Sequence, residues 1–237
     1  MKQRVFVLIA VLAAAGMASA APRKGHTVVL GAVRKVPYSR AGDPAGAVAG
    51  ETELKIRALL VDGVLKEWTT GDPHDVTDRS FVVRRALRLN DTLPGDKANQ
   101  WAWQRGPWLL IDRTTGHATP VKLPDYDPGV SQVSWFRDYA AYCGITSSGK
   151  SLFAVVAQVA GRKPVLAKKL SSFDPENHPA PVCTATDWQR DPLRVTFHPA
   201  GNPQGVAFDV APGSAVLVED STDQAETPET PEPAAKP

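Results

Sequence analysis

The sequence lacks the short patterns that usually mark metal sites and catalytic nucleophiles. It has only two cysteines in 237 residues, and they do not form a Cys-x-x-Cys pair. Its five histidines include no His-x-His or His-x-x-x-His pair, and no Gly-x-Ser-x-Gly segment occurs. Zinc sites and the serine nucleophiles of α/β-hydrolases are commonly recognised by such spacings. We therefore expect no metal site, no cofactor and no catalytic residue that the sequence can name.

Long apolar runs and a strong excess of one charge are also missing. No stretch of 18 apolar residues follows residue 20, so we expect no membrane span. The chain has 27 basic and 25 acidic residues, and the segment 21–218 holds 24 basic and 19 acidic ones. This basic excess is too small and too scattered to indicate nucleic-acid binding, although it suits an acidic glycan surface.

The first twenty residues have the pattern of a cleaved signal peptide. Lys2 and Arg4 precede the apolar run Val5–Ala15, and Ala18-Ser19-Ala20 provides the small residues that a signal peptidase needs. Ala21 follows the expected cut, with no cysteine nearby to carry a lipid. The sequence thus predicts an exported protein, periplasmic or extracellular, with a signal peptide at residues 1–20.

The rest of the chain is dominated by short strand patterns separated by turn residues. Residues 53–61 alternate apolar and polar side chains, and Asp62-Gly63 is a favoured tight-turn dipeptide. Many such runs predict one all-β domain over residues 51–220, with antiparallel sheets arranged as propeller-like hairpins or a β-sandwich. Two runs, Phe81–Leu89 and Leu152–Ala160, also fit a short helix on periodicity alone.

Both ends of the chain differ from this middle part in composition. Residues 21–50 are rich in glycine, alanine, proline and basic residues, and we expect them to be loosely ordered around one strand near 27–33. Residues 221–237 have no aromatic or large aliphatic side chain. Such a segment cannot bury enough surface to order itself, so a disordered acidic, proline-rich tail is expected.

Residues 144–151, Gly-Ile-Thr-Ser-Ser-Gly-Lys-Ser, match the phosphate-binding pattern G-x-x-x-x-G-K-[ST]. A phosphate loop normally follows a continuous aliphatic strand, whereas Tyr139–Cys143 contains two tyrosines and two alanines. An alternating βα pattern is also missing downstream. We interpret 147–150 as a hairpin turn and the segment from Ser151 as the next strand.

Two short segments resemble repeats of bacterial β-propellers. Ser147-Ser-Gly149-Lys150 with the following strand is similar to their Ser-Pro-Asp-Gly-Lys-x-Leu-Tyr hairpin. Trp108–Gly116 is similar to their hydrophobic strand that ends in Asp-x-x-Thr-Gly. The resemblance covers residues 108–170 and implies an interaction or ligand-binding scaffold without catalytic residues.

A second local resemblance points to carbohydrate binding. Residues 61–68, Val-Asp-Gly-Val-Leu-Lys-Glu-Trp, are similar to the Ile-Asp-Gly-x-Leu-x-Glu-Trp opening of family-nine carbohydrate-binding modules. The resemblance implies a β-sandwich that stacks sugars on aromatic rings. Trp101 and Trp103 share one strand face. The candidate sugar-stacking residues are Trp101, Trp103, Trp108 and Trp135, and the alternative is that these side chains form the core.

The cysteines and the arginine cluster each allow two interpretations. In an exported protein Cys143 and Cys183 form a disulfide, or else they are two buried thiols. Arg84, Arg85 and Arg88 mark a solvated strand edge, or else they contact acidic polysaccharide or lipid headgroups.

Together these patterns predict an exported, non-enzymatic binding or scaffold protein of the cell envelope. Its partner is expected to be a glycan or another envelope protein. One alternative is a carbohydrate-binding module that uses exposed tryptophans. A second is a secreted hydrolase whose site the sequence does not locate.

Overall fold

The computed structural model describes residues 25–39, 51–128, 130–161, 163–177, 182–211 and 216–217. Every regular element in these ranges is a strand, which confirms the all-β prediction. Both ambiguous runs, Phe81–Leu89 and Leu152–Ala160, contain strands and no helix. The expected signal peptide 1–20 and the expected tail 221–237 lie outside the described residues. Over the part that is described, no helix is long and apolar enough to cross a membrane.

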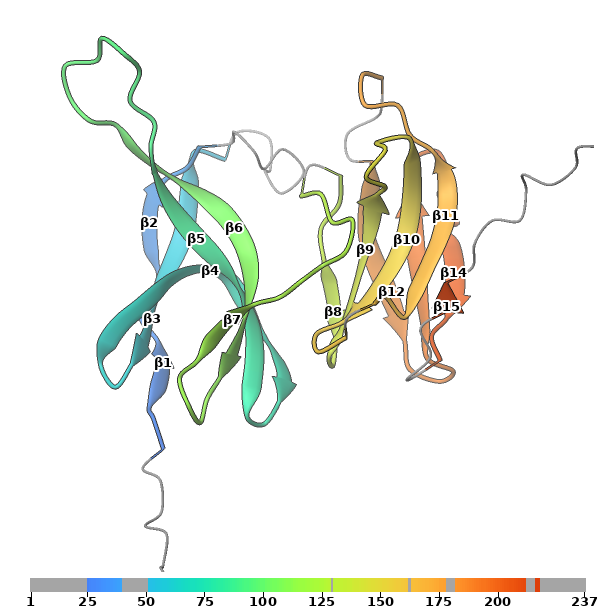
Figure 1. The fold of residues 1–237 in the computed structure, drawn as a ribbon, viewed down its shortest axis with the longest axis horizontal. Helices are drawn as coiled ribbons and strands as arrows, with labels where there is room; N and C mark the ends of the chain where they lie inside the picture. The colour runs from blue at the N-terminus through green and yellow to red at the C-terminus, as the bar shows by residue number, and fades with distance from the viewer. Residues whose placement is uncertain are drawn as a thin grey trace, which may run out of the picture.

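The first half of the chain forms one twisted antiparallel sheet, sheet A (Figure 1). Its strand order is β1-β3-β4-β5-β6-β7, and β2 pairs with β3 next to β1. Strands β3 to β7 are consecutive in the chain and are joined as hairpins, so each strand lies beside its sequence neighbour. The strands are β1 Val28–Leu30, β2 Arg34–Pro37, β3 Glu53–Val61, β4 Val64–Thr77, β5 Ser80–Asn90, β6 Trp101–Asp112 and β7 Ala118–Pro120.

The β3–β4 hairpin forms where the dipeptide Asp62-Gly63 predicts it. Both residues have positive φ angles, 52° and 77°, as a two-residue turn of this kind needs. His26 Nδ1 lies 2.6 Å from a carboxylate oxygen of Asp62, and the other oxygen accepts a bond from the Thr27 amide. Residues 25–39, inside the segment expected to be loose, thus supply β1, β2 and contacts to this turn.

Sheet A curls so that β6 returns to β2. Tyr38 forms a parallel bridge with Trp103, and the Ser39 amide donates a 2.9 Å hydrogen bond to the Trp103 carbonyl. The concave side holds a small core of Tyr38, Leu54, Ile56, Ala86 and Trp103, with Val36 and Trp68 packed against it. A second cluster, on the opposite face of β3, contains Leu59, Phe81, Val83, Leu109 and Ile111.

The second half is a two-layer β-sandwich. Sheet B has the order β15-β11-β10-β9-β8, and sheet C has the order β12-β13-β14. Side chains from both sheets share one core, which includes Tyr139, Val156, Val195 and Phe197. The strands are β8 Ser134–Phe136, β9 Tyr139–Ile145, β10 Ser151–Gln158, β11 Leu166–Ser172, β12 Cys183–Gln189, β13 Arg194–Pro199, β14 Val206–Asp209 and β15 Val216–Leu217.

The phosphate-loop match is the β9–β10 hairpin. Leu152 pairs with Ile145, and the antiparallel register continues to Gln158 opposite Tyr139. Gly149, with φ of 69°, donates its amide hydrogen to the carbonyl of Thr146 and closes the turn. A helix does not follow the turn, so the geometry of a phosphate loop is not present here, and the hairpin interpretation is confirmed.

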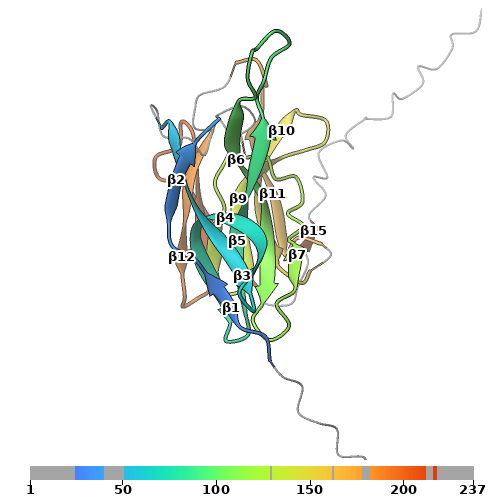
Figure 2. The ribbon, with the colours of Figure 1, turned by 90° about the vertical axis from the view of Figure 1, so that its left-hand side faces the viewer.

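The two halves meet at the outer face of sheet B. Figure 2, viewed from the side of sheet A, shows the second half behind it. Trp108 of β6 packs edge-on against Trp135 of β8, with ring centroids 5.2 Å apart. His74 of β4 stacks on the same Trp135, and its Nε2 donates a 2.8 Å hydrogen bond to the Arg137 carbonyl. The single domain over 51–220 stays a prediction, and within it each half has its own core.

Candidate ligand-binding groove

The structure divides the four candidate tryptophans into two pairs. Trp101 and Trp103 line a groove on the concave side of sheet A. Trp108 and Trp135 instead contact each other between the two halves of the chain, where both are partly buried. The first pair therefore lines the groove, whereas the second pair joins the halves.

The groove has a volume of about 380 Å³, within the range of roughly 300–1,000 Å³ that ligand sites occupy. Strands β2, β3, β4, β5 and β6 all contribute side chains to it. We name it the tryptophan groove. Its lining residues are Arg34, Val36, Pro37, Ile56, Trp68, Arg88, Trp101 and Trp103.

Strand register explains why these residues meet. Arg88 of β5 lies directly opposite Trp103 of β6, so both side chains are on the same face of the sheet. On the other side of the groove, Arg34 of β2 lies opposite Ile56 of β3. Trp101 is the first residue of β6 and follows the loop that projects beyond the sheet in Figure 1.

The three tryptophans of the groove differ in exposure and therefore in role. Trp103 is only 8% exposed and belongs to the core of sheet A. Trp68, which is half-buried, packs edge-on against Trp103 with ring centroids 5.7 Å apart. Trp101 is 45% exposed, which leaves a large part of its side chain in contact with solvent. Trp101 is thus the aromatic side chain that a ligand reaches most readily.

Each side of the groove carries an exposed arginine over a tryptophan. The guanidinium carbon of Arg88 is 4.7 Å from the Trp101 ring centroid, and that of Arg34 is 5.6 Å from the Trp68 centroid. These are cation–π contacts, which orient the guanidinium groups along the groove wall. The lining contains neither a carboxylate nor a side-chain hydroxyl or thiol, so the groove is aromatic and positively charged.

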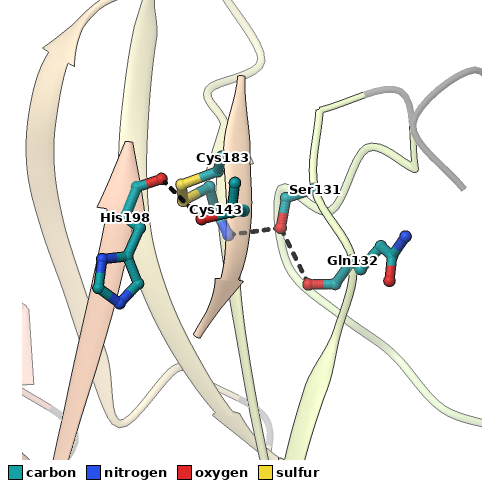
Figure 3. Close-up of a disulfide and its surroundings, with 6 residues drawn as sticks. Ser131, Gln132, Cys143, Cys183 and His198 are labelled. Carbon is teal, nitrogen blue, oxygen red and sulfur yellow. Dashed lines mark hydrogen bonds between the residues drawn. A yellow bond between two sulfur atoms is a disulfide. The ribbon is translucent and has the colours of Figure 1, made fainter. Parts of the chain in front are cut away.

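The two cysteines form the predicted disulfide. Cys143 on β9 is bonded to Cys183 on β12, with their Cα atoms 6.2 Å apart, so the bond joins sheet B to sheet C (Figure 3). The Cys143 amide donates a hydrogen bond of 3.0 Å to Ser131 Oγ, and that hydroxyl donates to the Gln132 carbonyl. Cys143 also shares a face with Tyr139 and Ala141 in the sandwich core, as the strand pattern predicts.

Sequence reasoning missed two groove residues and left a third open. Trp68 closes the motif at 61–68, but nothing in the sequence shows that it meets Trp103. Arg34 lies in the segment expected to be loose. Arg88 belongs to the arginine cluster: Arg84 and Arg85 are paired with β4 and so do not lie at an edge, whereas Arg88 lies past the end of that pairing and is opposite Trp103 of β6. The sequence does not show how β5 and β6 pair, because the ten-residue loop between them does not fix the register of the two strands.

Comparison of the chain with protein-family models, with curated proteins and with solved structures found no match. Among the described residues there is also no group of three or more histidine, cysteine, aspartate or glutamate side chains that would hold a metal ion. The groove is therefore the feature of the molecule from which a function can be inferred.

Proposed function

We propose that this chain is an exported, non-enzymatic binding protein of the cell envelope and that the tryptophan groove binds a glycan. The observation that carries the proposal is the exposure of Trp101 beside Trp103 and Trp68 in a groove of ligand size. Tryptophan combines a large apolar face with a polar edge, which suits the alternating C–H and O–H surface of a sugar. The geometry thus favours the carbohydrate-binding form of the binding function over a purely structural scaffold.

The lining of the groove supports binding more than hydrolysis. Most glycosidases have a pair of carboxylates, one on each side of the bond that is cleaved. The lining residues of the tryptophan groove include arginines, tryptophans and aliphatic side chains but neither aspartate nor glutamate. A ligand held there meets recognition groups without a general acid or a nucleophile.

A binding screen tests the proposal directly. The chain from Ala21 is mixed with a panel of envelope and plant oligosaccharides, and binding is followed by tryptophan fluorescence and calorimetry. Trp101→Ala should abolish binding of any oligosaccharide that the parent chain binds. Val64→Ala is the control, because Val64 is 61% exposed at a different hairpin. An unchanged affinity of Trp101→Ala, or a screen without any glycan bound, would contradict the proposal.

Export is supported by the signal pattern at residues 1–20 and is compatible with the disulfide. Expression in a secreting host should yield a chain that begins at Ala21, as measured by intact mass. Changing Ala18 and Ala20 to bulky residues should prevent that cleavage, because the peptidase accepts only small side chains at these positions. A normal mature end in this variant would show that the assignment of the cut is wrong.

A further inference from the structure

We infer that the tryptophan groove selects acidic oligosaccharides, with uronate carboxylates bound by Arg34 and Arg88. The inference rests on the proposed glycan-binding function and specifies the class of sugar. It follows from the charge of the groove, which the stacking function alone does not require. A groove for neutral sugars needs aromatic faces and neutral hydrogen-bonding groups. It does not need the two guanidinium groups that this groove contains.

The two groove arginines differ from four other arginines of the first half of the chain in their partners. In the part of the chain that the structure describes, neither Arg34 nor Arg88 has a hydrogen bond or an ion pair with a carboxylate, and each contacts a tryptophan ring. Other arginines of the sheet are matched to acids, and the pairs are Arg57–Asp72, Arg85–Glu67, Arg105–Glu51 and Arg113–Asp75. Among the described residues, the groove therefore gathers two positive charges that have no carboxylate partner.

The chemistry of these two side chains fits a carboxylate. A guanidinium presents five N–H donors in a planar fork that matches the two oxygens of a carboxylate. A contact with a tryptophan ring uses the π face of the guanidinium and leaves its N–H donors for another partner. The ring contacts of Arg34 and Arg88 also limit their rotamers in advance, so less conformational entropy is lost when an anion binds.

The arrangement of the groove places this charge next to the stacking surface. Arg88 contacts the exposed Trp101, so a sugar ring on Trp101 has its ring substituents near a cation. A uronic acid carries its carboxylate as such a substituent. Arg34 contacts Trp68 on the other side of the groove, where a neighbouring sugar unit can be bound in the same way.

The experiment compares charged and neutral forms of one oligosaccharide. Trigalacturonate and trimannuronate are titrated into the chain 21–237 by calorimetry, and so are their fully methyl-esterified forms. We expect at least one acid to bind about tenfold more tightly than its ester, and added salt to reduce this difference. Arg34→Gln and Arg88→Gln should each lower the affinity for the acid more than the affinity for its ester, and so remove most of the preference.

Arg190→Gln is the matched control. Arg190 is also exposed and lies over an aromatic ring, that of Phe136 at 5.8 Å, but it belongs to the second half of the chain. Its replacement removes the same charge and the same kind of contact, and it should leave the preference for acids intact. If Arg190→Gln lowers the preference as much as Arg88→Gln, net charge is responsible and the inference is overturned.

Three further outcomes separate this inference from the proposed function. Equal affinity for acid and ester, with both lost in Trp101→Ala, would overturn acid selection and leave glycan binding in place. A failure of every oligosaccharide in this test and in the screen would overturn both. A synthetic peptide of residues 219–237, which has six acidic residues and one lysine, is the third probe. Tighter binding of this peptide than of either uronate would assign the groove to the chain's own tail instead.

Discussion

Trp101 and Trp103 are two residues apart on one strand face, yet 45% of one side chain is exposed and only 8% of the other. The difference arises because Trp103 bridges to Tyr38 where the sheet closes, while Trp101 lies beyond that closure at the first position of β6. At the scale of single residues, stability and binding therefore depend on different tryptophans of the groove. One tryptophan supports the fold and its neighbour is available to a ligand.

Replacing each of these tryptophans by alanine should separate the two roles. Trp103→Ala removes a buried side chain from a small core and should reduce the free energy of unfolding by about 3–5 kcal/mol. Trp101→Ala should reduce it by less than about 1 kcal/mol, because it removes an exposed ring and a single cation–π contact. Urea denaturation measures both. Equal losses in the two variants would contradict the assignment of roles.

Tyr142 offers a pH-dependent prediction at the same scale. Its hydroxyl is buried and donates a 2.6 Å hydrogen bond to the Pro124 carbonyl. Burial raises the pKa of Tyr142 above its ordinary value of 10.0, and the nearby Asp125 raises it further. Because the pKa of Tyr142 is higher in the folded state, its contribution to stability is fully present at pH values below the pKa of tyrosine in the unfolded chain. This stabilisation is lost as the pH rises above about 10, because the unfolded chain ionises first.

The comparison with Tyr142→Phe tests this sign. The variant loses the hydrogen bond and leaves a buried carbonyl, so it should be about 1–2 kcal/mol less stable near pH 8. Because phenylalanine does not titrate, the gap between the two proteins should shrink between about pH 8 and about pH 11. Urea midpoints at several pH values provide the measurement. A gap that stays constant or widens would show that Tyr142 does not contribute to alkaline unfolding.

At the scale of elements, two turns that carry propeller-like motifs have clear local causes. Asp112 ends β6, and one of its carboxylate oxygens accepts hydrogen bonds from the amides of Thr114 and Thr115. These backbone donors lower the pKa of Asp112. Gly116 and Gly149 then provide the positive φ angles of the two turns, 67° and 69°. The resemblance to propellers itself stays a prediction, because these turns need only local chemistry.

The two glycines should respond differently to alanine. A Cβ at Gly149 meets nothing within 4 Å, so Gly149→Ala should cost only the conformational penalty of about 1 kcal/mol. A Cβ at Gly116 would lie 2.4 Å from Val61 Cγ1, so Gly116→Ala should cost more than about 2 kcal/mol. Thermal unfolding of the two variants measures the difference. A reversed order would mean that the contact with Val61 is relieved without cost.

The same elements show how far the sequence determines this protein. Alternation and turn residues predicted most of the strands, the Asp62-Gly63 turn and the hairpin at 144–151, because these depend on neighbours in the chain, but they did not predict β2 or β12. They did not predict that Tyr38, directly after β2, bridges to Trp103 of β6. They also did not predict that Trp68 and Arg34 line the groove, since that depends on the curvature of the sheet and on pairing between residues that are distant in the chain.

At the scale of the whole molecule, the halves are stabilised by different means. The core of sheet A is divided into small clusters on two faces, whereas the sandwich has a larger shared core and the disulfide. The halves are connected by His74, Trp108 and Trp135, which come from three different strands. The groove, on sheet A, is distant in sequence from both cysteines.

Reduction of the disulfide should therefore destabilise the sandwich. The bond closes a loop with a sequence separation of 40, which corresponds to about 3–4 kcal/mol in the chain-entropy treatment. Calorimetry should show a fall in Tm of several degrees, since each kcal/mol shifts a domain of this size by about 2–4 °C. A variant with both cysteines changed to alanine should have a Tm that reductant does not alter.

Thiol titration of the unfolded, unreduced chain provides the direct check. No reactive thiol should be found, because Cys143 and Cys183 are the only cysteines and are bonded to each other. Two reactive thiols per chain would show that the bond does not form.

The contiguity of sheet A has a consequence for the order in which the protein matures. All pairing partners of β1 to β7 lie between Val28 and Pro120, and none comes from the later strands. Hairpin contacts between sequence neighbours form quickly, and domains tend to fold in the order of their synthesis. The strands that line the groove can thus pair before Cys183 has been synthesised. If the groove binds a ligand as proposed, its maturation should therefore not depend on formation of the disulfide, which belongs to the later half.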